Sequence, residues 1–168
     1  MVTPEPAKSL RPPGDATAAS PAASVDQVDT RYLETLIGYN ARRAALAVIG
    51  VFLPRMAAFG LKPVAFSVVS LIAHNPGITS RQLCAALNIL PPNLVGLINS
   101  LAQRGLIERL PHPRDGRAMG LHLTEEGREV MAQAEKTASA LEVEAAGRLS
   151  AAERQTLITL LRKVYLPD

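Results

Sequence analysis

Hydrophobic positions recur at steps of three and four residues through the first structured part of the chain. From Thr30 to about Pro54 they form one apolar stripe, which predicts a single long helix with a broad apolar face. Gly60 and Pro63 mark a break, and proline suits the first turn of the next helix. Residues 64–74 are apolar on nearly all sides, so this segment is predicted to be a buried central helix.

Two short helices are predicted next. Thr79-Ser80-Arg81-Gln82 has the pattern of a capping box, in which the threonine and glutamine side chains satisfy backbone donors at a helix start. The short helix 80–87 and a tight turn lead to an amphipathic helix that opens at Pro91-Pro92. Gly105 stands where a left-handed residue closes a helix. Two short helices joined by such a turn predict a helix-turn-helix.

After Gly105 the hydrophobic period changes from helical to strand-like. Residues 106–110 and 120–124 read as two short strands, and the segment 111–117 between them is rich in turn-forming residues and arginine. This pattern predicts a β-hairpin with a basic tip. A long polar helix is predicted to start at Thr124, and a second capping box at Ser150 opens the last helix.

These elements predict a mainly α fold with a small β-hairpin wing. Residues 1–26 hold five of the thirteen prolines and show no periodicity, so we expect a disordered Pro/Ala-rich tail. The remaining chain, 27–168, is expected to form one domain. Its parts are a winged helix-turn-helix lobe at about 61–124 and dimerisation helices at about 28–56 and 125–166.

The charge distribution adds a candidate partner. The net charge is only +3, but residues 41–120 carry nine basic and two acidic side chains, a local net charge of +7. A basic segment of this kind indicates a surface suited to a polyanion. In a winged helix-turn-helix the second helix offers its N-terminal residues to the major groove of double-stranded DNA, and the hairpin tip reaches phosphates or the minor groove. The candidate DNA-binding residues are Arg81, Pro92, Asn93, Gly96, Asn99, Ser100, Arg109, Arg114, Asp115 and Arg117.

The sequence contains no pattern typical of a metalloprotein, an enzyme or a membrane protein. One cysteine and three scattered histidines exclude a disulfide framework and a cysteine-rich zinc site, so neither a metal nor a cofactor is expected. No catalytic triad order, carboxylate pair or phosphate-cradling glycine loop appears, which argues against an enzyme. The longest apolar stretch, 44–53, is half of the ~20 residues that a membrane span needs, and no signal peptide is recognisable. We therefore expect no membrane anchor and a cytoplasmic location.

Three stretches resemble the MarR family of transcriptional regulators. They are residues 75–79, residues 101–109, and the wing sequence Asp115-Gly116-Arg117 followed by residues 121–127. The resemblance implies an obligate homodimer with intertwined first and last helices that binds a near-palindromic operator. It further implies a repressor that a small ligand releases by binding between the dimer helices and the winged lobe.

The recognition helix departs from the family pattern. Leu90 stands where a polar N-cap is usual, and Gly96 stands where a basic residue is usual. Only Asn93 and Asn99 offer amide readout, which suits adenine, so more of the DNA affinity is assigned to the arginines through phosphates and groove shape. The weakened helix also leaves an alternative open, in which the winged fold is a protein-interaction module with weak or no DNA binding.

Arg42 and Arg43 stand in an otherwise apolar helix and allow two readings. Both side chains extend into solvent or pair across a dimer, or they anchor an anionic ligand through parallel hydrogen bonds. In the second reading Tyr39 and Phe66 line the pocket, although aromatic residues at helical spacing are more often plain core. Some regulators that this chain resembles respond to aromatic acids or their coenzyme A thioesters, which fits paired arginines.

Overall fold

The computed structural model describes residues 28–112 and 115–166. In chain order its elements are α1 (Arg31–Glu34), α2 (Ile37–Met56), the 3-10 helix η1 (Ala57–Phe59), α3 (Pro63–His74), α4 (Ser80–Leu87), α5 (Pro91–Gln103), β1 (Ile107–His112), β2 (Asp115–Leu123), α6 (Glu125–Ala145) and α7 (Ala151–Tyr165). The two strands pair in an antiparallel sheet. The predicted mainly α fold with a small hairpin is thereby confirmed.

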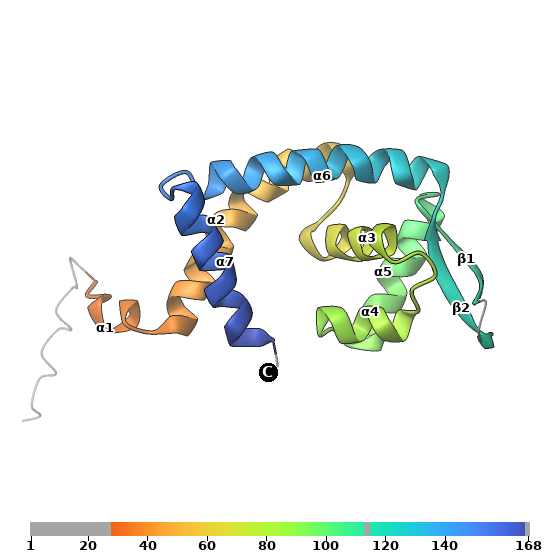
Figure 1. Cartoon of the computed structure of the whole chain (residues 1–168), viewed down its shortest axis with the longest axis horizontal. Helices are drawn as coiled ribbons and strands as arrows, with labels where there is room; N and C mark the ends of the chain where they lie inside the picture. The colour runs from red at the N-terminus through yellow and green to blue at the C-terminus, as the bar shows by residue number, and fades with distance from the viewer. Residues whose placement is uncertain (1–27, 113–114, 167–168) are drawn as a thin grey trace, which may run out of the picture.

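The helix α6 organises the arrangement in space (Figure 1). It runs along the length of the molecule and contacts both α2 and α3. At one end α1, α2 and α7 form a helical arm, and at the other end α3, α4, α5 and the hairpin form a compact lobe. We use the terms arm and lobe for these two groups of elements.

The lobe encloses the main hydrophobic core. Its fully buried side chains include Val68, Val69, Ile72, Leu83, Leu94, Ile98, Leu101 and Leu121, and α6 adds Met131. Complete burial of one such side chain contributes roughly 1.5–3 kcal/mol. The apolar faces predicted for the short helices therefore meet one another inside the lobe, which fixes α4 and α5 relative to the hairpin.

A short backbone bridge ties the hairpin to the loop before α4. Ile78 pairs with Leu121 of β2, with hydrogen bonds from Gly77 N to Leu121 O and from Leu121 N to Ile78 O, both 2.9 Å. A Cβ on Gly120 would lie 2.9 Å from the Cα of Gly77. The two segments approach this closely because Gly120 lacks a side chain, and glycine is favoured at position 77 by its φ of +86°.

The first turn of α6 packs directly on the turn that follows α5. The Thr124 hydroxyl accepts a 3.0 Å hydrogen bond from the Gly127 N–H and donates to the carbonyl oxygen of Gly105. Gly105 has φ +72°, in agreement with the predicted left-handed closure. A Cβ on Gly127 would lie 1.9 Å from the carbonyl oxygen of Leu106, so only glycine permits this contact.

The prediction of one continuous first helix is wrong. The sequence pattern placed it from Thr30 to about Pro54, but α1 and α2 are separate helices. Leu36 between them is extended, with φ −93° and ψ 128°. The Asn40 amide donates 2.8 Å hydrogen bonds to the carbonyl oxygens of Glu34 and Leu36. A side chain that satisfies backbone carbonyls in this way competes with helical hydrogen bonding.

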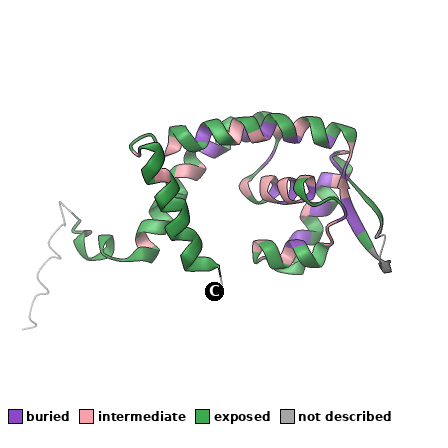
Figure 2. Cartoon of the chain, in the orientation of Figure 1, coloured by how far each residue is buried: buried purple, intermediate pink, exposed green. Residues whose placement is uncertain are grey.

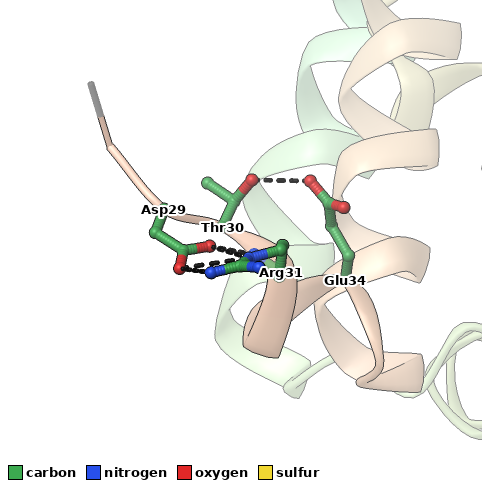
Figure 3. A network of polar contacts seen from close by, with 4 residues as sticks. All are labelled: Asp29, Thr30, Arg31 and Glu34. Carbon is green, nitrogen blue, oxygen red and sulfur yellow. Dashed lines mark hydrogen bonds and ion pairs between the residues drawn. The ribbon is translucent and has the colours of Figure 1, made fainter.

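A small polar network marks the start of α1 (Figure 3). The Asp29 carboxylate accepts hydrogen bonds from the backbone and the guanidinium of Arg31, and the Thr30 hydroxyl donates to Glu34 at 2.6 Å. The bonds from the Arg31 side chain hold the pKa of Asp29 below its ordinary value, and Asp29 raises the pKa of Arg31. Since all of these groups face water, the network shapes the local chain and adds little to global stability.

Burial differs sharply between the two ends of the molecule (Figure 2). Buried residues gather in the lobe and along α6, whereas α1 and α7 contain none. The exposed side chains of α7 nevertheless include Leu157, Ile158, Leu160, Leu161 and Val164. An apolar face of this extent rarely stays in contact with water and commonly marks a site of association with another protein.

Within the described residues, no single helix is both long and apolar enough to cross a membrane. Two bent helix pairs, α2–η1 with α3 and α4 with α5, reach that threshold only when taken together.

We expect Gly127→Ala to lower the free energy of unfolding by about 2–4 kcal/mol, because the added Cβ overlaps a backbone oxygen that has no freedom to rotate away. Urea denaturation followed by circular dichroism, at one fixed protein concentration, measures the change. Gly96→Ala is the matched control: a Cβ there meets nothing within 4 Å, so helix propensity alone should make this variant about 0.5–1 kcal/mol more stable. Equal stability of the Gly127 variant and the unaltered protein would contradict the close contact.

Candidate DNA-binding site

The helix-turn-helix forms as its sequence signals predicted. Thr79 and Gln82 make both hydrogen bonds of the capping box at the start of α4. Asn88 ends α4 in the left-handed conformation, with φ 49°, and α5 starts at Pro91 after a bend of 117°. Leu83 and Leu94 are fully buried, so the core holds the two helices at this angle.

The outer face of α5 carries no charged residue and combines polar with small apolar residues. The predicted contact residues on this helix are all exposed, namely Pro92, Asn93, Gly96, Asn99 and Ser100. Val95 lies on the same exposed part and is 53% accessible. A Cβ on Gly96 would meet nothing within 4 Å, so no side chain protrudes from the middle of the helix at this position. A DNA groove could therefore approach the backbone of α5 closely.

Basic side chains surround this helix rather than extend from it. Arg81 is exposed in the first turn of α4, and Arg109 is exposed on β1. The Arg109 guanidinium donates a 2.7 Å hydrogen bond to the side-chain oxygen of Asn99, so these two predicted residues meet. Among the described residues neither arginine has an ion pair, which leaves both charges available to an anion.

The tip of the wing is described only in part. The strands pair from Ile107 opposite Leu123 to Pro111 opposite Met119, and the register shifts between Pro111 and His112. Arg114 lies outside the described residues. Asp115 and Arg117 belong to β2, but their side chains also lie outside the described part. The roles of these three residues therefore remain sequence predictions.

One contact beside the recognition helix was not predicted from the sequence. Arg104, next to the end of α5, donates hydrogen bonds of 2.9 Å to the Gly60 carbonyl and 2.7 Å to the Phe59 carbonyl. These carbonyls belong to the chain segment that connects α2 to α3. The contact ties the end of the recognition helix to the end of the arm. No local pattern signals it, because the partners are about 44 residues apart.

The four predicted ligand-binding residues do not gather within one chain. Tyr39 is half-buried and Arg42 and Arg43 are exposed, all on the first half of α2. Phe66 lies on α3, where its ring packs edge-on against Phe52 with centroids 5.7 Å apart. Phe52 stands nine residues beyond Arg43, about 13 Å along the helix axis.

A cavity of about 420 Å³ lies elsewhere, between the end of α3, the hairpin and the first half of α6. Ile72, Leu110 and Met131 supply part of its apolar lining, and Glu108 and His122 part of its polar lining. None of the four predicted ligand-binding residues lines it. Among residues 28–112 and 115–166, no three side chains of histidine, cysteine, aspartate or glutamate gather to hold a metal ion, and Cys84 is half-buried against the lobe core.

The geometry defines the class of protein: a winged helix-turn-helix lobe carried on a helical scaffold. A sequence profile of the MarR family matches residues 59–118. The chain is 32% identical to a putative transcriptional regulatory protein for the hcr operon of Thauera aromatica, over 79% of this chain and 80% of that protein. It is 31% identical to the transcriptional regulator HosA of Escherichia coli, over 59% of this chain and 73% of HosA.

Solved structures agree with these sequence matches. The CouR transcriptional repressor bound to a 23-mer DNA duplex superposes with a TM-score of 0.78 and 33% identity, over 84% of this chain and 100% of that one. CouR bound to p-coumaroyl-CoA gives 0.74 and 32%, over 82% and 97%. Apo MarR of Escherichia coli gives 0.67 and 25%, over 78% and 98%.

The chain belongs to the MarR family. It is a DNA-binding transcriptional regulator, and the relatives named above are regulators rather than enzymes.

Proposed function

We propose that the protein is a homodimeric repressor that binds a near-palindromic operator and is released by a small anionic or aromatic ligand, such as an aromatic acid or its coenzyme A thioester. The observation that carries the proposal is the exposed apolar face of the arm, joined through α6 to a lobe with a complete helix-turn-helix. The arm supplies a surface for a second copy of the chain, and the lobe supplies the contact with DNA.

The apolar residues of the arm support the dimer. Val164 and Tyr165 near the end of α7 are 68% and 69% accessible, and Ile37 at the start of α2 is 71% accessible. A self-complementary contact about a two-fold axis would cover both helices in each protomer. It would also place two lobes side by side, as half-sites one turn of DNA apart require.

DNA binding by this chain is proposed to depend on charge more than on base contacts. The helix α5 has no charged residue, whereas Arg81 and Arg109 are exposed beside it. Arginine suits both phosphates and the narrow minor groove, so we assign the wing residues Arg114 and Arg117 to the same task. Asn93, in the first turn of α5, is then the main candidate for reading a base.

The relatives and the first helix support the proposed ligand class. CouR, 32% identical to this chain, has been solved with p-coumaroyl-CoA bound. Arg42 and Arg43 are exposed on α2, and among the described residues they have no ion pair. Guanidinium groups bind carboxylates and phosphates with two parallel hydrogen bonds. In a dimer the arm of one protomer can bring these arginines near the lobe of the other, which a single chain does not.

We expect Leu161→Glu to weaken dimerisation by about 100-fold or more, because each protomer would bury an unpaired carboxylate in the two-fold interface. Sedimentation velocity at micromolar concentration measures the change in mass. Thr159→Glu adds the same charge on the opposite face of α7 and should leave the dimer intact. A compact monomer for the unaltered protein would refute the proposed dimer.

We expect Arg117→Ala to weaken operator binding by about tenfold or more with an unchanged fold, since the residue ends the wing sequence that reaches the minor groove. Fluorescence anisotropy with duplexes from the protein's own promoter region gives the affinity, and circular dichroism checks the fold. Arg148→Ala removes the same charge outside the lobe and serves as the control. Failure of the unaltered protein to bind any duplex would favour the protein-interaction alternative.

We expect the double variant Arg42→Ala, Arg43→Ala to keep operator binding but to lose its response to ligand. In the unaltered protein we expect the binding of ligand and the binding of DNA to be linked by a coupling free energy of about 1–3 kcal/mol. Each of the two then lowers the affinity for the other by the same factor. Isothermal titration with aromatic acids and their coenzyme A thioesters, with and without operator, measures it. The Arg42→Lys, Arg43→Lys variant keeps the charge without the planar fork and should bind with intermediate affinity. Loss of dimerisation or of DNA binding without ligand would show that the arginines are structural.

A further inference from the structure

The hydrogen bond between Arg109 and Asn99 joins the wing to the recognition helix. Arg109 lies on β1 and Asn99 on the outer face of α5, and both side chains are exposed. The turn around Gly105 folds β1 back along α5, which brings the two residues to 2.7 Å although they are ten positions apart. The neighbouring Glu108 alternates to the other side of the strand and lines the cavity, so it does not neutralise Arg109.

This bond changes what Asn99 can offer to DNA. An asparagine reads adenine by accepting a hydrogen bond at its oxygen and donating one from its nitrogen at the same time. In this chain the oxygen of Asn99 already accepts from a cation. This bond takes one of the two lone pairs of the Asn99 oxygen and fixes the orientation of the amide, and the remaining N–H donors of the amide and the guanidinium outnumber the one acceptor site that is left. Such a surface suits a negatively charged ligand whose polar atoms are hydrogen-bond acceptors.

The position of the two side chains favours the phosphate backbone of DNA as this ligand. Asn99 stands eight residues after Pro91, about 12 Å along α5, whereas the N-terminal residues of a recognition helix contact the bases. The helix and the wing address neighbouring grooves, and a phosphate strand runs between two grooves. Asn99 and Arg109 meet where β1 folds back along α5, which is between the helix and the tip of the wing.

We propose that Asn99 and Arg109 act together as a phosphate clamp, in which Asn99 is a positioning residue that orients the guanidinium and does not read a base. This inference rests on the proposed binding of DNA. It replaces the adenine contact that the sequence suggested for Asn99, and it leaves Asn93 as the amide that reads sequence. The clamp would add affinity equally at every operator sequence.

The test compares affinity, base preference and salt dependence. Sites are selected from random-sequence duplexes by the unaltered full-length protein, and binding is measured by anisotropy over a range of salt concentrations. Arg109→Ala should bind about tenfold more weakly, with unchanged base preference and a salt slope reduced by about one. Asn99→Ala should bind about threefold more weakly, also with unchanged base preference. The double variant should bind no more weakly than Arg109→Ala alone, because both changes remove one contact.

Two further variants separate positioning from a general structural role. Asn99→Asp keeps a hydrogen-bond acceptor for Arg109 but neutralises its charge, so it should reduce the salt slope as Arg109→Ala does. Asn93→Ala is the matched control on the same helix and should relax base preference at one position. Thermal melting of each variant verifies folding.

Each outcome decides the proposal. A change of base preference in Asn99→Ala, or additive losses in the double variant, would overturn the clamp while leaving operator binding in place. If the unaltered protein selects no site and binds no duplex, the proposed function itself fails and the clamp fails with it.

Discussion

The close backbone contact between α6 and the turn after α5 sets the geometry of the whole molecule. Gly127 lies against the carbonyl oxygen of Leu106 with no room for a side chain, and Thr124 caps α6 at the same point. Beside the same turn, Arg104 donates hydrogen bonds to the carbonyl oxygens of Gly60 and Phe59. The turn after α5 is thus bonded both to the start of α6 and to the segment between α2 and α3, which fixes the end of the recognition helix relative to these helices.

Apolar surface is distributed unevenly between the lobe and the arm. The lobe is small, but its three helices, the hairpin and one side of α6 together enclose a continuous core. The arm has no such partner, because α2 contacts α6 with only part of its surface and α7 buries no residue at all. A chain that leaves one end uncovered is suited to association, and association at that end determines how far apart two lobes stand.

The sequence by itself determined the elements whose signals are local. The capping boxes at Thr79 and Ser150 could be predicted because each joins residues three positions apart, and Gly105 because a left-handed residue at a helix end favours glycine. The change from helical to alternating periodicity after Gly105 likewise predicted the hairpin. These signals sufficed for the winged helix-turn-helix, and the exposed residues on α5 follow from the helical period alone.

Contacts between distant segments were decided only by the tertiary structure. The two hydrogen bonds of Arg104 depend on carbonyls of another helix end, and the bond between Arg109 and Asn99 depends on how tightly β1 folds back along α5. The break before α2 was not predicted, because the spacing of apolar residues carries no information about the side-chain amide of Asn40. This amide donates hydrogen bonds to two backbone carbonyl oxygens at the break. Periodicity reports which face of an element is buried, whereas the choice of polar partners depends on where the folded chain places their donors and acceptors.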